Sequence, residues 1–176
     1  KVIETIQDRL TQKEFLQSRG LPLAPFAAVD TQTSLAAGVR RLGPDCILKR
    51  RRAGYDGKGQ QVITAQTDLS VAESLLSAPC VLERKVSFDK ELSVILSRDK
   101  QGAVTFFPLA ENIHRKGILH ATVAPARISS EVRKKAEDLA AAAASALGHV
   151  GVLAAELFLL PGGALLINEI APRVHN

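Results

Sequence analysis

The segment LKRRRAGYDGKGQ, residues 48–60, is the most informative part of this 176-residue chain. An apolar strand ends at Lys49, and a basic run then opens into a loop that carries Gly54, Gly57 and Gly59. Glycine allows positive φ angles and lets the backbone approach a ligand closely. Successive exposed N–H groups in such a loop can bind an anion, and lysines add positive charge for phosphate. The spacing matches neither GxxxxGK[ST] nor GxGxxG. The segment alone fits either a phosphate-binding loop or a basic surface hairpin.

Composition indicates a soluble globular protein of one domain or two closely joined subdomains, with 46% hydrophobic and 23% charged residues. The net charge of +5 suits nucleic acid or a polyphosphate nucleotide, but 4% aromatic residues are few for a protein that stacks on single strands. No stretch reaches the ~18 apolar residues that cross a bilayer, and no signal peptide is visible. We therefore expect a cytoplasmic protein with no membrane partner.

The two cysteines and the absence of methionine each lead to a further expectation. Cys46 and Cys80 each stand alone in an apolar run, which predicts buried thiols in a reducing compartment rather than a disulfide or a zinc site. The chain contains no methionine and ends in polar, site-like sequence. We therefore expect it to be a piece of a longer protein.

The hydrophobic pattern predicts an α+β fold in two lobes. We expect helices over residues 8–19, 31–41, 68–76 and 129–147. We expect strands over residues 46–48, 61–64, 81–86, 91–96, 104–108, 118–124, 150–160 and 164–170. The last two strands form a hairpin around Pro161-Gly162-Gly163. A change from small mixed elements to an antiparallel sheet with one long helix divides the chain into lobes of residues 1–86 and 87–176.

Two carboxylates stand out on the predicted hairpin. Glu156 and Glu169 are each a lone acid in an apolar strand, where an unpaired carboxylate is costly to bury. The turn lies about midway between them, so antiparallel strands would bring them close together. Close carboxylates repel unless they share a proton or a cation, and Mg²⁺ takes one or two carboxylates together with nucleotide phosphates. Each glutamate could instead pair with a surface Arg or Lys, but Asn168 beside Glu169 favours a metal. A phosphate-binding loop and a magnesium site together predict an ATP-dependent enzyme.

Five segments, in order along nearly the whole chain, resemble one enzyme family. They are Gln7-Asp8-Arg9, residues 49–60, Glu83 with Glu91, PLAENIH at residues 108–114, and NEIAPRVHN at residues 168–176. These segments resemble the ATP-grasp fold and, within it, the PurK family of 5-(carboxyamino)imidazole ribonucleotide synthases of purine biosynthesis. The GYDGKGQ and NEIAPRVHN motifs are specific to this family among ATP-grasp enzymes. The resemblance implies two α+β lobes with a nucleotide bound between them.

The resemblance also implies which residues bind ATP. Arg9 and Lys49 would neutralise its phosphates, the loop at residues 54–60 would close over the triphosphate as a mobile lid, and residues 83–86 would form a hinge that reads the adenine. Glu91 would accept hydrogen bonds from the ribose, and His114 would contact the nucleotide. The full implied set is Arg9, Lys49, Gly54, Tyr55, Asp56, Gly57, Lys58, Gly59, Gln60, Glu83, Arg84, Lys85, Val86, Glu91, His114, Asn168 and Glu169. Glu156 and Glu169 would hold Mg²⁺.

The chemistry implied by the resemblance is an ATP-driven carboxylation without biotin. Bicarbonate would attack the γ-phosphate to give carboxyphosphate and ADP, and the exocyclic amine of aminoimidazole ribonucleotide would capture carboxyphosphate or the CO₂ released from it. The protein would contribute mainly positioning and charge neutralisation. The implied residues for aminoimidazole ribonucleotide are Tyr55, Asp56 and Lys58; those for bicarbonate and carboxyphosphate are Arg173, His175 and Asn176.

The sequence departs from the family at both ends. The family usually has a Rossmann-like domain before this region and a small domain after it, and its His-Asn-Ser-Gly-His signature stops here after Asn176. We therefore expect this chain to bind ATP but to turn over poorly alone, and the full-length enzyme to be a homodimer. Two alternatives remain: another ATP-grasp ligase that activates an amino acid or formate, and a non-enzymatic module that binds RNA or DNA through Arg50-Arg51-Arg52 and Lys58. The second would leave the acidic hairpin without a purpose, so we expect no nucleic-acid partner.

Overall fold

The computed structural model describes residues 2–52, 54, 59–115 and 117–174 and divides the chain into two compact units. Unit 1 comprises Lys1–Gln7, Thr11–Leu23 and Ser87–Asn176, and unit 2 comprises Asp8–Leu10 and Ala24–Val86. The change of unit after Val86 coincides with the boundary expected from the sequence. Most of the first 23 residues, which we expected in the first lobe, group with unit 1 instead.

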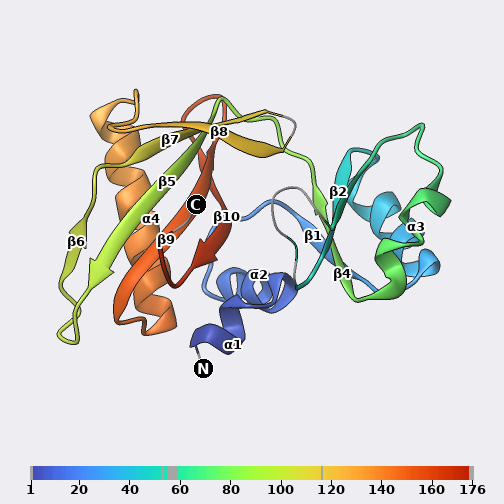
Figure 1. The fold of residues 1–176 in the computed structure, drawn as a ribbon, viewed down its shortest axis with the longest axis horizontal. Helices are drawn as coiled ribbons and strands as arrows, with labels where there is room; N and C mark the ends of the chain where they lie inside the picture. The colour runs from blue at the N-terminus through green and yellow to red at the C-terminus, as the bar shows by residue number, and fades with distance from the viewer. Residues whose placement is uncertain (1, 53, 55–58, 116, 175–176) are drawn as a thin grey trace. The chain divides into compact units, whose positions relative to one another are not determined.

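Unit 2 is a four-stranded antiparallel sheet in the order β1-β4-β2-β3, with a helix packed on one face (Figure 1). Its elements are β1 (Phe26–Val29), α3 (Gln32–Leu42), β2 (Cys46–Arg50), β3 (Gln60–Ile63) and β4 (Cys80–Arg84). Thr31 caps α3 in a capping box with Ser34, which confirms the predicted start of this helix. The predicted pairing across the glycine loop is also confirmed, because Lys49 lies opposite Gln60.

The core of unit 2 lies between this sheet and α3. Alternate residues of β2 and β4, including Leu48 and Leu82, are fully buried against Leu35 of the helix. Cys46 and Cys80 belong to the same core, which confirms the prediction of buried thiols. Burial raises the pKa of both thiols, so they stay protonated at neutral pH.

Unit 1 is built around a six-stranded antiparallel sheet with strand order β10-β9-β5-β7-β8, in which β6 pairs with β5. The strands are β5 (Lys90–Arg98), β6 (Val104–Phe106), β7 (Ala110–Arg115), β8 (Ile118–Val123), β9 (Gly151–Leu159) and β10 (Leu165–Ala171). The helices are α1 (Val2–Ile6), α2 (Arg9–Ser18) and α4 (Ser130–Leu147); the first two residues of α2 group with unit 2. The long helix α4 covers one face of the sheet (Figure 1).

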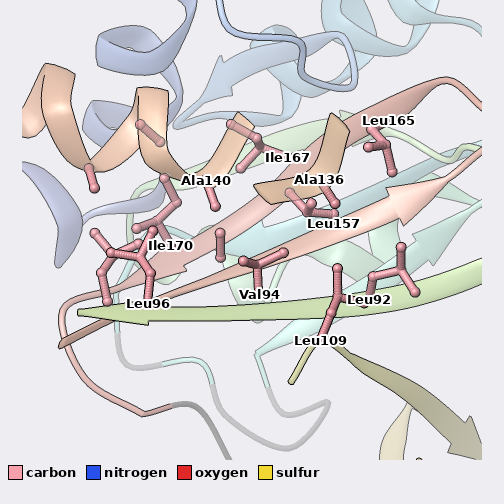
Figure 2. Packing of buried hydrophobic residues seen from close by; sticks show 14 of the residues in the cluster. Leu92, Val94, Leu96, Leu109, Ala136, Ala140, Leu157, Leu165, Ile167 and Ile170 are labelled. Atoms are coloured by element: carbon pink, nitrogen blue, oxygen red, sulfur yellow. The ribbon is translucent and has the colours of Figure 1, made fainter. Parts of the chain in front are cut away.

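One face of the unit 1 sheet forms its hydrophobic core (Figure 2). Leu92, Val94 and Leu96 of β5 alternate toward α4, together with apolar residues of β9 and β10. The helix contributes only small side chains at the centre, where Ala136 and Ala140 are fully buried. Glu91, Ser93 and Glu156 alternate with these core residues along β5 and β9, so their side chains lie on the opposite face of the sheet. In the part of the chain that is described, no helix is long and apolar enough to span a membrane.

Some local predictions were wrong or incomplete, and helix α1 was not predicted. The helix predicted over residues 68–76 is two short 3₁₀ turns, η1 (Leu69–Ala72) and η2 (Leu75–Ser77), although Asp68 does cap the first by accepting from Ser70 N. Strand β1 was not predicted, because its sequence is short and alanine-rich. Strand β7 was read as a loop, because its alternation is polar rather than apolar.

Candidate functional site

The two carboxylates singled out from the sequence lie directly opposite each other in unit 1. Glu156 on β9 is the register partner of Glu169 on β10, and both side chains are half-buried. Directly opposite residues of an antiparallel pair have Cβ atoms about 4.5–5.5 Å apart on one face of the sheet. The predicted proximity of the two carboxylates is thus confirmed.

A β-bulge at Asn168 produces this arrangement. Ile167 pairs with Leu157, yet Glu169 pairs with Glu156, so β10 carries one extra residue between the two pairs. In a regular register Asn168 would face Glu156, and Glu169 would point to the other face of the sheet, toward α4. The bulge therefore moves Glu169 from the core face to the polar face, as bulges beside functional sites often do.

This donor set fits a magnesium ion. Mg²⁺ prefers hard oxygen ligands and is usually held by one or two carboxylates, with nucleotide phosphates and water as its remaining ligands. Among the residues described, no group of three or more His, Cys, Asp and Glu side chains is placed to hold a metal ion. Two carboxylates match the usual protein share of a magnesium site whose other ligands are phosphate oxygens and water.

Glu91 and His114 meet on the same polar face. His114 Nδ1 lies 2.6 Å from Glu91 Oε2, and both side chains remain about one-quarter exposed. Glu91 is the register partner of Asn112 on β7 and of Phe158 on β9. The structure thus brings together two residues that the sequence placed separately at the nucleotide.

A short chain of hydrogen bonds continues across this face. Thr122 Oγ1 donates to Asn112 Oδ1 at 3.0 Å, and Asn112 Nδ2 donates to Ser93 Oγ at 2.7 Å. Ser93 is in turn the register partner of Glu156. Sequence reasoning assigned no role to these three residues. The sequence signal that could have identified them was the alternation of polar residues along β7 up to His114, a segment that we interpreted as a loop.

In unit 2, Lys49 is held by a buried ion pair. Its Nζ lies 2.9 Å from Glu83 Oε2, and the two side chains are 14% and 5% exposed. Lys49 alternates with buried Cys46 and Leu48 on β2, so it projects from the sheet face opposite α3. The structure therefore places the candidate phosphate lysine beside the first residue of the candidate adenine hinge.

The basic run after Lys49 is engaged within unit 2. Arg51 and Arg52 both form ion pairs with Asp8, and Arg50 donates to Ser74 O and Ser77 Oγ, each at 3.2 Å. These contacts use the guanidinium groups that the nucleic-acid alternative requires for phosphate binding.

The other candidate residues occupy edges of the two units. Arg9 opens α2 and donates its backbone N–H to Arg51 O. Within the hinge segment, Arg84 N donates to Pro25 O and Lys85 N to Asp45 O, and Val86 follows at the end of unit 2. Four further positions complete the set. Gly54, Gly59 and Gln60 lie before and at the start of β3, and Arg173, after β10, is exposed and donates to Val174 O.

Six predicted site residues lie outside the described residues: Tyr55, Asp56, Gly57, Lys58, His175 and Asn176. The prediction that the glycine loop is mobile without nucleotide falls on the first four of them, so it too concerns residues outside the described part.

Comparison with known proteins gives a consistent result. The family model for the ATP-grasp domain matches residues 14–176. The N5-carboxyaminoimidazole ribonucleotide synthase of Bacillus subtilis (strain 168) is 46% identical over 171 residues, which are 97% of this chain and 45% of the relative. This chain thus spans about half the length of the curated relatives it matches.

Solved structures are similar over the same region. The ADP complex of purK, an N5-carboxyaminoimidazole ribonucleotide synthetase, aligns with a TM-score of 0.94 at 41% identity over 99% of this chain and 47% of that one. The Aspergillus clavatus N5-carboxyaminoimidazole synthase, in complex with ADP and 5-aminoimidazole ribonucleotide, aligns with a TM-score of 0.88 at 30% identity, over 99% of this chain and 46% of that one.

Proposed function

The chain belongs to the ATP-grasp domain family, and from this we propose that it is the ATP-binding part of an N5-carboxyaminoimidazole ribonucleotide synthase. The observation that carries the proposal is the opposed pair Glu156 and Glu169 on a sheet face that also holds Glu91 and His114. A carboxylate pair for a metal–phosphate ligand beside a carboxylate–imidazole pair suits a nucleotide better than a nucleic-acid backbone. The similarity to synthases of this name along nearly the whole chain supports the choice of reaction.

The reaction would join bicarbonate to 5-aminoimidazole ribonucleotide at the expense of ATP, in de novo purine biosynthesis. A bicarbonate oxygen attacks the γ-phosphorus, the bond to the β-γ bridging oxygen breaks, and ADP leaves. The exocyclic amine of the ribonucleotide then attacks the carboxyl carbon of carboxyphosphate, or CO₂ released from it, with loss of phosphate and a proton. The protein supplies positioning and charge neutralisation rather than a covalent intermediate.

Unit 1 would provide the metal site and the ribose contact. Glu156 and Glu169 would hold Mg²⁺, with Asn168 alongside, and the metal would neutralise charge on the β- and γ-phosphates. Glu91, oriented by His114 at 2.6 Å, would accept hydrogen bonds from the ribose hydroxyls. We propose Arg173, with His175 and Asn176, for the bicarbonate and carboxyphosphate, because a guanidinium fork matches a planar anion.

Unit 2 would provide the phosphate and adenine contacts. Lys49 and Arg9 would neutralise the phosphates, and the loop that includes Gly54, Gly59 and Gln60 would cover them. The adenine would be read at residues 83–86. Because the N–H groups of Arg84 and Lys85 already donate within the unit, backbone contacts to the base would come from Val86 and from carbonyl groups. Tyr55, Asp56 and Lys58 would contact the aminoimidazole ribonucleotide, on the basis of the sequence motif.

The cellular setting follows from the same proposal. ATP, bicarbonate and a purine precursor meet in the cytoplasm, where we place the protein, and we propose that the full-length enzyme is a homodimer. A nucleic-acid module is disfavoured, because Arg51 and Arg52 are already paired with Asp8.

Two experiments test the proposal. The first titrates the chain with a non-hydrolysable ATP analogue with and without Mg²⁺; we expect binding that depends on Mg²⁺. The second replaces the matching segment of the Bacillus subtilis relative with this chain and measures phosphate release. We expect release to require both bicarbonate and 5-aminoimidazole ribonucleotide. Release that ignored bicarbonate but responded to an amino acid or formate would assign the chain to another ATP-grasp ligase.

A further inference from the structure

The proposed function gives no role to the carboxylate of Asp8 in unit 2, which accepts hydrogen bonds from two arginines and a backbone N–H group. Its side chain is 4% exposed although it precedes a helix. Oδ1 accepts from Arg51 Nε at 2.9 Å and from the backbone N–H of Leu10 at 3.1 Å, and Oδ2 accepts from Arg52 Nε at 3.1 Å. A buried carboxylate is stable only when paired and hydrogen-bonded, so these contacts fix its position.

The same group connects two parts of the chain that are far apart in sequence. It caps the start of α2, where Arg9 lies, and it anchors the residues that follow β2. A backbone hydrogen bond from Arg9 N to Arg51 O, at 3.0 Å, runs beside the ion pairs. Arg9 is thereby fixed relative to the end of β2.

The start of β3 is tied to the same assembly. Arg50 N donates to Gly59 O at 2.8 Å, and Arg51 N donates to Pro79 O at 3.1 Å. Gly59 has a φ of +75°, a conformation that glycine adopts readily. The end of β2 and the start of β3 are thus held by one hydrogen-bonded network. Within the residues described, Asp8 supplies the only buried carboxylate of this network.

We propose that Asp8 is a positioning residue for the triphosphate. It holds Arg9 and the ends of the glycine-rich segment, residues 54–60, in fixed positions before the nucleotide binds. This inference rests on the proposed function, because it assumes that Arg9 and this segment contact phosphate. It explains why the basic run Arg50-Arg51-Arg52 lies beside a phosphate-binding loop and yet uses its guanidinium groups inside the protein.

One substitution distinguishes a positioning role from a purely electrostatic one, because the two roles predict opposite changes in ATP affinity. In Asp8→Asn the side chain keeps its size and one acceptor for Leu10 N, but it loses the negative charge that orients both arginines. If only charge mattered, removing a negative charge near phosphate would tighten ATP binding. Positioning predicts the reverse, namely about tenfold weaker binding of a non-hydrolysable ATP analogue. AMP, which lacks the β- and γ-phosphates, is expected to bind unchanged.

The experiment is a set of calorimetric titrations of the 176-residue chain with Mg²⁺ and either the ATP analogue or AMP. Asp68→Asn is the matched control: Asp68 also caps a turn of unit 2, by accepting from Ser70 N at 2.9 Å, but it is exposed and contacts no arginine in the hydrogen bonds and ion pairs described. We expect the ratio of ATP-analogue to AMP affinity to fall in Asp8→Asn and to stay at the wild-type value in Asp68→Asn.

Unchanged or tighter binding of the ATP analogue by Asp8→Asn would overturn the inference, as would an equal loss for both ligands, which is the mark of a purely structural role. Circular dichroism establishes whether the variant folds. If it does not, Arg52→Gln replaces it, because Arg52 is 63% exposed and its loss removes only one donor to Asp8. A fall in the same affinity ratio then supports the inference, and an unchanged ratio overturns it. Failure of the wild-type chain to bind the ATP analogue would instead refute the proposed function, and this inference with it.

Discussion

The two units differ in the charges that they place at their candidate site residues. In unit 2, among the residues described, buried charges are paired with opposite charges: Lys49 with Glu83 at 2.9 Å, and Asp8 with two arginines. Unit 1 places two like charges, Glu156 and Glu169, at directly opposite positions on neighbouring strands. Opposite charges held together fix side-chain geometry before a ligand arrives, whereas like charges held together favour the binding of a cation or a proton. From this difference we infer that the ion pairs of unit 2 hold their side chains in place before a ligand binds, and that the carboxylate pair of unit 1 favours a ligand that brings a cation.

The largest effect should come from breaking the buried pair of unit 2. Lys49→Met would remove the ammonium group that lies 2.9 Å from the Glu83 carboxylate, whose side chain is 5% exposed. We expect a loss of about 3 kcal/mol in the free energy of unfolding, because removing one partner of a buried ion pair takes away the attraction that offsets the desolvation of the other. Urea denaturation of the chain would measure it.

The double variant Lys49→Met/Glu83→Gln is the control for this change. Removing both charges should restore part of the lost stability, because the buried carboxylate charge is then removed together with the ammonium group. A double variant that is less stable than the sum of the two single changes would contradict the view that the pair is held mainly by charge.

The next largest effect concerns the like charges of unit 1. Glu156→Gln should weaken Mg²⁺-dependent binding of an ATP analogue about a hundredfold, since one of two carboxylate ligands is lost. Glu14→Gln, the same substitution at an exposed position of α2, should leave binding unchanged. Equal affinity of Glu156→Gln and wild type in a calorimetric titration would refute the metal assignment.

The smallest effect lies on the core side of the unit 1 sheet, where a carboxylate is paired as in unit 2. Lys90 Nζ lies 2.7 Å from Glu111 Oε1, and this hydrogen bond lowers the pKa of Glu111 below its usual value. A lowered carboxyl pKa adds stability that is present above the unfolded pKa, near 4, and is lost as the pH falls through the folded value. The contribution of this pair to the stability of wild type should therefore be lost as the pH falls below about 4.

Glu111→Gln should flatten that part of the pH profile of unfolding. Glu131→Gln is the comparison, since Glu131 forms an exposed pair with Lys135 on α4, where solvent screens the interaction. A steeper acid dependence in Glu111→Gln than in wild type would contradict the assigned sign.

Much of the fold was predictable because local signals agreed with the tertiary structure. Thr31 and Ser129 start helices that the sequence predicted, and the Gly-rich turn at residues 161–163 joins the predicted hairpin. The elements that were predicted wrongly are short or have an ambiguous sequence pattern. A capping aspartate at residue 68 was followed by only enough helix-favouring sequence for a 3₁₀ turn, and the polar alternation of β7 hid a strand that is buried only at one end.

The candidate site was predictable in its residues but not in its geometry. The spacing of Glu156 and Glu169 about the turn predicts proximity, yet a regular hairpin would have paired Glu156 with Asn168. The bulge that corrects this depends on the packing of both strands and leaves no sequence signal that we recognise. The Asp8 network was hidden for a related reason, since its partners are more than 40 residues away in the chain.

The alanines of α4 have a consequence for how this protein can change over generations. Four of them are buried with no exposed surface, and they lie against a sheet whose other face holds the candidate metal and ribose residues; they are Ala136, Ala140, Ala143 and Ala144. A larger side chain at any of them would push the helix from the sheet or bend the strands beneath it. Substitutions at these positions should thus be confined to glycine and serine. A selection experiment that randomises the four positions would therefore measure how much distortion the opposite face of the sheet tolerates.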